Sequence, residues 1–133
     1  MNKLVFIFIF LIALSACIKR TNPLDPNNNL DIIVPQKVTN FSAVALSSTT
    51  VRLTWDKRAG ADGYYIYRSM SINGDYIRVD NDRLNNENYE EFLDENPAFI
   101  SQTFYWYKIS AYKIYNGSAL EGYRSDPLYV YIP

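Results

Sequence analysis

Apolar and polar side chains alternate in several short runs between residues 36 and 133. A period of two residues is typical of strands with one buried face, because successive side chains of a strand point to opposite sides. No segment of useful length shows the period of a helix, so we predict a domain built from strands. The apolar positions of the runs are Phe41, Ala43, Ala45, Val51, Leu53, Trp55, Tyr64, Ile66, Tyr76, Ile77, Val79, Phe92, Tyr105, Tyr107, Ile109, Ala111, Leu128, Val130 and Ile132.

Turn-forming residues separate these runs. The polar segments are residues 47–50, Asp62-Gly63, Asn73-Gly74-Asp75, residues 80–88 and Asn116-Gly117. Seven short strands at this spacing favour an all-β sandwich. We place this domain at residues 36–133, which are enough for one apolar core without disulfides.

Three strings along the domain are similar to those of a known family. They are Val51-x-Leu53-x-Trp55, the run Gly63-Tyr64-Tyr65-Ile66-Tyr67-Arg68-Ser69, and Tyr105-x-Tyr107-x-Ile109-x-Ala111. In this order they resemble a fibronectin type III domain, a seven-stranded immunoglobulin-like sandwich. The resemblance implies that Trp55 lies in the core and that the Tyr105 hydroxyl binds backbone near the preceding loop. The segment from Glu95 to Thr103 is longer than is usual in this family.

The alternation also predicts which side chains share a face. It assigns Tyr64, Ile66, Tyr105, Tyr107 and Ile109 to the core, together with Trp55. The opposite face would carry Tyr65, Tyr67, Trp106, Lys108, Tyr112, Tyr129 and Tyr131. The family topology makes their strands neighbours, so we predict one solvent-facing aromatic surface. Such a surface either strengthens the sheet by cross-strand pairing or binds a partner, which could be a protein or a glycan.

The N-terminus has a different pattern. Eleven apolar residues, Leu4 to Leu14, follow Lys3 and precede Ser15-Ala16-Cys17. This run is too short to span a bilayer and has the length of a signal-peptide core. The arrangement resembles the lipobox of bacterial lipoproteins, which implies cleavage after residue 16 and a lipid on Cys17. The alternative is a plain secretory signal with Cys17 as an incidental thiol.

Residues 17–35 are polar, contain three prolines and lack a periodic pattern, which indicates a flexible tether. Alternatively, the branched run Ile32-Ile33-Val34 packs on the edge of the domain, since exposing it is unfavourable. The signal peptide then covers residues 1–16. The acylated N-terminus and the tether cover residues 17–35, and the sandwich covers residues 36–133.

Composition limits the chemistry that the chain can perform. It has no histidine, and Cys17 is its one cysteine. Histidine is the commonest general base and metal ligand in proteins, so both roles lack their usual residue here. Neither Ser69 nor Ser125 has a histidine to activate it. Without Lys3, 12 Lys and Arg stand against 14 Asp and Glu, so no basic field favours nucleic acid. The stretch Asp80-Asn81-Asp82 begins like a calcium loop but lacks its glycine and terminal glutamate.

We therefore expect a lipid-anchored, exported protein without catalytic activity, cofactor or metal. It would act as a scaffold or adhesion module that binds a protein, or alternatively as a glycan-binding accessory module of the cell envelope. The residue after Cys17 is Ile18 rather than aspartate. By analogy with enteric bacteria, this favours the outer membrane over the inner membrane.

Overall fold

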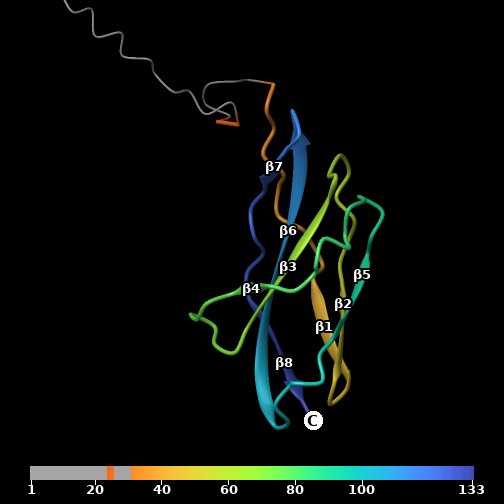
Figure 1. Ribbon diagram of the computed structural model, residues 1–133, viewed down its shortest axis with the longest axis vertical. Coiled ribbons are helices and arrows are strands. Elements are labelled where there is room, and N and C mark those ends of the chain that lie inside the picture. The colour runs from red at the N-terminus through yellow and green to blue at the C-terminus, as the bar shows by residue number, and fades with distance from the viewer. Residues whose placement is uncertain (1–23, 26–30) are drawn as a thin grey trace, which may run out of the picture.

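The alternating runs form antiparallel strands that pair into two facing sheets (Figure 1). The computed structural model describes residues 24–25 and 31–133. The smaller sheet has the order β1 (Ser42–Ser47), β2 (Thr50–Thr54) and β5 (Glu91–Glu95). The larger sheet has the order β4 (Ile77–Arg78), β3 (Gly63–Ser69) and β6 (Thr103–Tyr115), with β7 (Ser118–Glu121) and β8 (Leu128–Ile132) both paired to β6. This arrangement confirms the predicted all-β sandwich.

The core lies between the two sheets and follows the predicted alternation. Its largest fully buried side chains include Tyr64 and Tyr107. The Trp55 ring lies 5.3 Å from that of Tyr64, centroid to centroid. The structure thus places all six predicted core residues inside, namely Trp55, Tyr64, Ile66, Tyr105, Tyr107 and Ile109.

The long loop before β6 closes one end of this core. Phe99 packs edge-on against Tyr105 at a centroid distance of 4.9 Å. The backbone N–H of Ile100 donates a 3.0 Å hydrogen bond to the Tyr105 hydroxyl. The Tyr105 hydroxyl thus holds the loop that precedes its own strand.

The strand β7 was not predicted. Its sequence, Ser-Ala-Leu-Glu, has no β-branched residue, and Asn116-Gly117 was interpreted as the end of a strand. The structure instead makes these two residues a hairpin turn, with φ of 50° and 79°. After β7 ends, the Gly122 N–H still donates to the Ala111 carbonyl of β6, and a Cβ atom on Gly122 would lie 2.3 Å from the carbonyl oxygen of Pro35. The edge of the sheet is therefore formed by two separate strands, β7 and β8.

Residues 31–35, which we call the docked segment, lie against the end of the domain where β6 finishes. Ile32 is buried. The Ile33 N–H donates to the Tyr115 hydroxyl at 2.9 Å, and that hydroxyl donates to the Ile33 carbonyl at 3.1 Å. The packing of the domain thus begins before residue 36. Cys17 and the predicted signal peptide lie outside the described residues. Residues 24–25 and 31–133 contain no apolar helix of the length that a bilayer requires.

One buried ion pair joins the two sheets. Arg68 of β3 and Asp94 of β5 approach to 2.6 Å (Nη1 to Oδ2), with side chains 13% and 7% exposed. The Tyr107 hydroxyl of β6 donates to the same Asp94 oxygen at 2.7 Å. Burial and then the charge of Asp94 raise the pKa of Tyr107 well above its ordinary value. The three side chains come from β3, β5 and β6, so the group connects the two sheets.

Candidate binding surface

The outer face of the larger sheet brings the predicted aromatic residues together. In the register of this sheet, Trp106 of β6 is opposite Tyr129 of β8, and Lys108 is opposite Tyr67 of β3. Phe104 pairs with Tyr131. The predicted residues therefore share one face, but the structure divides that face into a covered part and an exposed part.

The covered part is centred on Glu121 of β7. The hydroxyls of Tyr67 and Ser110 donate to its Oε1 at 2.8 and 2.7 Å. Arg124 donates to the same oxygen at 2.9 Å, and its guanidinium lies 3.8 Å from the centre of the Tyr67 ring. One carboxylate thus accepts three donors while an arginine covers the tyrosine.

This network shifts the pKa values of its members in opposite directions. Burial raises the pKa of Tyr67 to about 12, assisted by its hydrogen bond to Glu121. Burial by itself would also raise the pKa of Glu121, but hydrogen bonds from Arg124, Ser110 and Tyr67 outweigh it and lower that pKa. Tyr67 therefore stays protonated and Glu121 ionised near neutral pH.

A second stack covers the neighbouring part of the face. Tyr65 and Tyr112 stack at 4.5 Å with an angle of 18° between their planes. The guanidinium of Arg78 lies 4.1 Å from the Tyr65 ring centre. The carboxylate of Asp80, which is fully buried, accepts hydrogen bonds from the Nε and Nη2 of Arg78 and from the N–H of Ile66. The Asp80 carboxylate is therefore occupied by protein donors.

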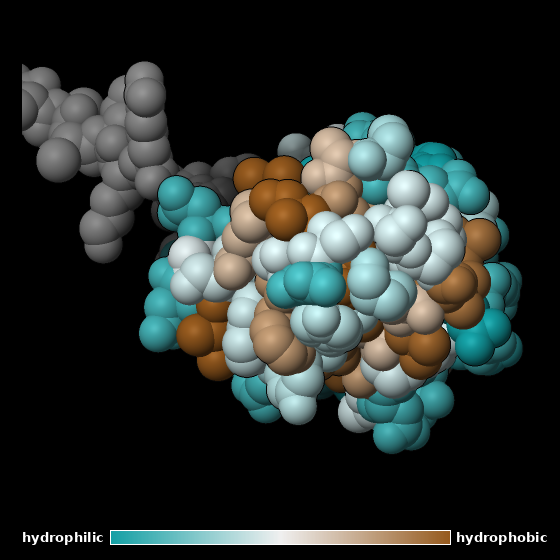
Figure 2. All heavy atoms as spheres, turned by 90° about the horizontal axis from the view of Figure 1, so that it is seen from below, coloured by the Kyte–Doolittle hydropathy of each residue, from teal (hydrophilic) through white to brown (hydrophobic). Residues whose placement is uncertain are grey.

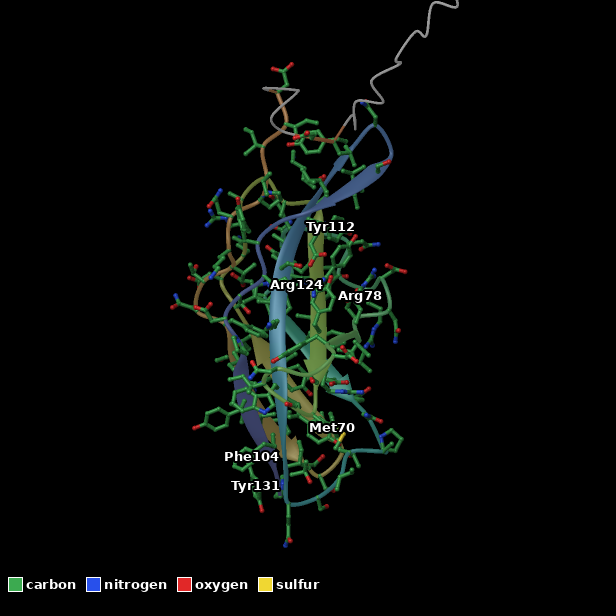
Figure 3. The ribbon with its side chains drawn as sticks, turned by 90° about the vertical axis from the view of Figure 1, so that its left-hand side faces the viewer. Met70, Arg78, Phe104, Tyr112, Arg124 and Tyr131 are labelled. Atoms are coloured by element: carbon green, nitrogen blue, oxygen red, sulfur yellow. The ribbon has the colours of Figure 1, made fainter. Side chains whose placement is uncertain are left out.

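The prediction that the whole aromatic face is exposed is wrong for Tyr67 and Tyr112, which are 7% and 8% exposed. Alternation places both on the outer face correctly. Side chains from other strands and loops then cover this part of the face, as the positions of Arg78, Arg124 and Tyr112 in Figure 3 show. Lys108 is also engaged, with its Nζ 4.2 Å from the Tyr76 ring centre.

The exposed part lies at the other end of the sheet and consists of Phe104, Trp106, Tyr129 and Tyr131, which we call the aromatic tip. Phe104, Tyr129 and Tyr131 are 49%, 61% and 46% exposed, and Trp106 is half-buried. Figure 3 shows Phe104 and Tyr131 together at this end, far along β6 from Tyr112. Phe104 is not among the predicted residues of this face, although its position two residues before Trp106 puts it on the same side of the strand.

The rings of the aromatic tip are tilted against one another. The Phe104 ring lies 5.6 Å from that of Tyr129 at 77°, and 5.2 Å from that of Tyr131 at 55°. Trp106 and Tyr129 are 5.4 Å apart at 59°. Seen end-on in Figure 2, mostly pale residues with hydrophilic ones among them occupy the middle of this end, and brown residues form separate patches around them. Tyr and Trp side chains, which combine an apolar ring with a polar group, are enriched at protein interfaces.

The structure also places the residues considered above for metal binding and nucleophilic chemistry. Among residues 24–25 and 31–133, no group of three or more Asp, Glu, His or Cys side chains is placed to hold a metal ion. Ser69 is buried, and its hydroxyl accepts the N–H of Ser71. The hydroxyl of Ser125 accepts the N–H of Ile109. Both serines therefore serve the local backbone.

Comparison with known proteins supports the fold. An Fn3-like protein from Clostridium thermocellum is 28% identical, with a TM-score of 0.54 over 76% of this chain and 93% of that one. The FN5 domain of Drosophila Lar has a TM-score of 0.54 at 19% identity, over 75% of this chain and 98% of that one. The fold is therefore fibronectin type III-like, as the resemblance in the sequence implied.

One match to a curated protein covers a short segment of the chain. A tyrosine-protein phosphatase Lar-like of Caenorhabditis elegans is 42% identical over 48 residues. This match takes in 33% of the chain but spans only 2% of that protein. No protein-family model matches the chain.

Proposed function

We propose that this protein is an exported, lipid-anchored binding module without catalytic activity, and that its aromatic tip holds a protein partner. The observation that carries the proposal is the exposure of Phe104, Tyr129 and Tyr131 beside the half-buried Trp106, at one end of a sheet on which Tyr67 and Tyr112 are buried. Large exposed apolar patches on a folded domain mark interaction sites. Trp and Tyr are also the side chains that most often dominate binding energy at interfaces.

The tilt of the rings favours a protein over a glycan. Neighbouring rings of the tip meet at 55–77°, so they form a ridged surface without a flat strip on which a sugar chain could stack. A ridged aromatic cluster fits an apolar groove of a protein, in which each ring is surrounded on several sides. A glycan-binding accessory module remains the alternative function.

The anchor is the second part of the proposal. The run from Leu4 to Leu14 followed by Ser15-Ala16-Cys17 supports a lipid on Cys17. Two or three acyl chains hold a protein on a membrane, whereas a single chain does so only marginally. The protein would then belong to the cell envelope, with the outer membrane favoured by Ile18. Cys17→Ser should abolish labelling by a palmitate analogue, and wild-type protein that takes up no label would refute the anchor.

The partner can be identified and then measured. A photo-reactive amino acid at position 131, within the aromatic tip, should cross-link one envelope protein in intact cells. With that protein purified, Tyr129→Ala and Trp106→Ala should each weaken binding about 30-fold, the effect of losing about 2 kcal/mol at an interface hot spot. Tyr89→Ala, which removes an exposed tyrosine outside the tip, is the matched control and should leave the affinity unchanged.

The same variants separate the competing explanations. If the tip only strengthens the sheet, Trp106→Ala lowers the stability and leaves every binding measurement unchanged, and the proposal fails. If the ligand is a glycan, the wild type is retarded in gels that contain envelope polysaccharide and Tyr129→Ala is not. That result would replace the protein partner with the alternative function.

A further inference from the structure

We propose that the end of the domain opposite the aromatic tip rests on the bilayer, through the side chains of Ile33, Ile114 and Tyr123. We call these three residues the tether patch. The inference depends on the proposed lipid at Cys17, and it names the surface that the anchored end contacts. It also gives the aromatic tip a direction, away from the membrane.

The residues of the tether patch belong to the docked segment or to the parts of the chain next to it. The three side chains of the patch are 50–71% exposed. Ile33 belongs to the docked segment and is bonded on both of its backbone groups to Tyr115. Ile114 precedes that tyrosine at the end of β6. Tyr123 follows β7, and its N–H donates to the carbonyl of Pro35 at 3.2 Å. Three large apolar side chains are thus exposed at one end of the domain.

The length of chain between the patch and the anchor selects the bilayer as the surface that covers it. Asp31, where the docked segment begins, is 14 residues from Cys17. A chain of that length spans at most about 50 Å when fully extended. A tether this short keeps the patch at a high effective concentration near the lipid surface. A weak apolar contact is then enough to hold that end on the membrane.

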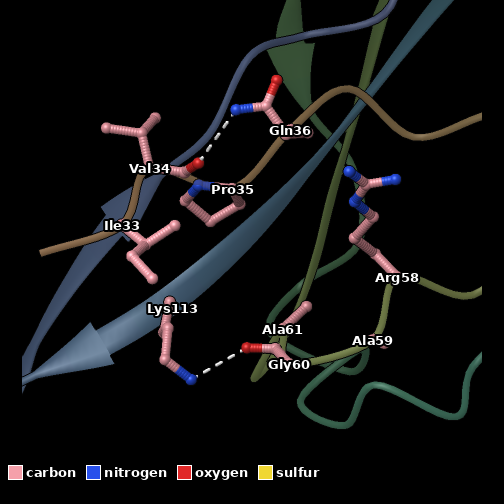
Figure 4. Close-up of a pocket in the computed structure, with 9 residues that line it drawn as sticks. All are labelled: Ile33, Val34, Pro35, Gln36, Arg58, Ala59, Gly60, Ala61 and Lys113. Carbon is pink, nitrogen blue, oxygen red and sulfur yellow. Dashed lines mark hydrogen bonds between the residues drawn. The ribbon is translucent and has the colours of Figure 1, made fainter.

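The docked segment transmits this contact to the domain. It runs beside Ala59, Ala61 and Lys113 and encloses with them a mostly apolar cavity of about 310 Å³, shown in Figure 4. The Lys113 Nζ closes one side by donating to the Gly60 carbonyl at 2.8 Å. Gly122 packs so closely on Pro35 that no side chain would fit there. The segment is therefore part of the domain, and the tether joins the domain at a defined place.

The charges at this end predict no preference for anionic lipid. Arg58 and Lys113 line the cavity, but Asp62 accepts the N–H of Ile114 and Glu87 accepts the N–H of Gly60. Cations and anions are therefore mixed around the tether patch. The contact we infer is apolar, and it should form on neutral and anionic membranes alike.

The strand β6 separates the two ends of the domain. Tyr115, bound to the docked segment, and Phe104, in the aromatic tip, are 11 residues apart on this one strand. At 3.2–3.4 Å per residue they are about 36 Å apart. When the tether patch lies on the bilayer, the aromatic tip is raised by that distance. The partner of the tip is therefore reached in the aqueous space and not in the lipid.

The experiment uses the lipidated protein with one added cysteine, because acylation blocks the thiol of Cys17. Ile114→Cys and Phe104→Cys are each labelled with an environment-sensitive fluorophore and reconstituted in vesicles of phosphatidylethanolamine, with or without phosphatidylglycerol. We expect a blue shift and quenching by spin-labelled lipid at position 114 in both vesicle types. At position 104 we expect neither effect, and quenching by aqueous iodide.

A second set of variants tests the patch itself. In the Ile114→Cys background, Ile33→Ser with Tyr123→Ser should abolish the blue shift, whereas Ile100→Ser, an exposed isoleucine at the opposite end, should not. The mass of the acylated N-terminal peptide reports the anchor separately. A missing acyl mass refutes the proposed anchor. When the acyl mass is correct, the inference alone is refuted if the fluorophore shows no shift at position 114 or a shift at both positions. It is also refuted if the shift requires phosphatidylglycerol, or if cross-linked dimers form in place of the shift.

Discussion

The ion pair between Arg68 and Asp94 offers a direct test of how the two sheets are held together. Asp94→Asn keeps the size of the side chain and removes its charge. Both partners are almost fully buried, and they come from different sheets. The substitution therefore leaves a guanidinium in the core without an opposite charge. Breaking a buried pair in this way costs about 3–5 kcal/mol, a large share of the 5–15 kcal/mol that stabilises a typical domain.

The Tyr107 hydroxyl adds a second, smaller contribution. It donates to the same Asp94 oxygen that Arg68 approaches, so Tyr107→Phe removes one hydrogen bond to a charged acceptor. We expect a loss of about 1.5–3 kcal/mol. Because the two positions share one oxygen atom, the double variant should differ from the sum of the single ones by at least about 0.5 kcal/mol.

Urea unfolding of the wild type and the variants measures these differences, with a surface ion pair as the control. Lys37 and Asp126 also form a salt bridge, but their side chains are mostly exposed. Asp126→Asn should therefore cost no more than about 1 kcal/mol. If Asp94→Asn costs as little as Asp126→Asn, the pair is open to water and the sheets are not joined as described.

Three further variants test the core, the covered face and a close backbone contact. Trp55→Ala should lower the unfolding free energy by about 3–5 kcal/mol, because it empties a buried site; a loss below about 1 kcal/mol would contradict its place in the core. Stabilisation linked to Tyr67, whose pKa is raised from 10.0 to about 12, is complete below pH 10 and is lost as the pH rises toward 12. Urea midpoints across that range should fall less steeply in Tyr67→Phe, and equal slopes would count against the burial of this hydroxyl. Gly63→Ala places a Cβ atom 2.2 Å from the Leu84 carbonyl oxygen and should cost about 1–3 kcal/mol, whereas an unchanged midpoint would mean that β3 and the loop at Leu84 are not in close contact.

The aromatic face shows where reasoning from the sequence succeeded and where it ended. Alternation assigned Tyr67 and Tyr112 to the outer face, and the register confirms that side. Their burial depends on other parts of the chain. Glu121, which binds the Tyr67 hydroxyl, lies 54 residues further along. No local pattern shows that Arg124 will lie across that ring.

The two ends of β6 also differ in what the sequence predicts and what depends on distant contacts. The identity of Phe104 and its position two residues before Trp106 are visible in the sequence, so its side of the sheet could have been predicted. The exposure of the aromatic tip could not, because it depends on which neighbouring segments stop short of it. The docked segment likewise depends on a bond between Ile33 and Tyr115, which are 82 residues apart.

From the order of the residues alone one can predict the class of fold, the side of each strand that faces the core, and, from the N-terminal pattern, export and a lipid. These properties are local, because strand periodicity and signal patterns are carried by residues close together in the chain. The packed fold is needed to see which aromatic side chains remain exposed, which pairs of charges join the sheets, and where residues 31–35 lie on the domain. Those properties arise from contacts between residues far apart in the chain, and such contacts form only when the two sheets pack together.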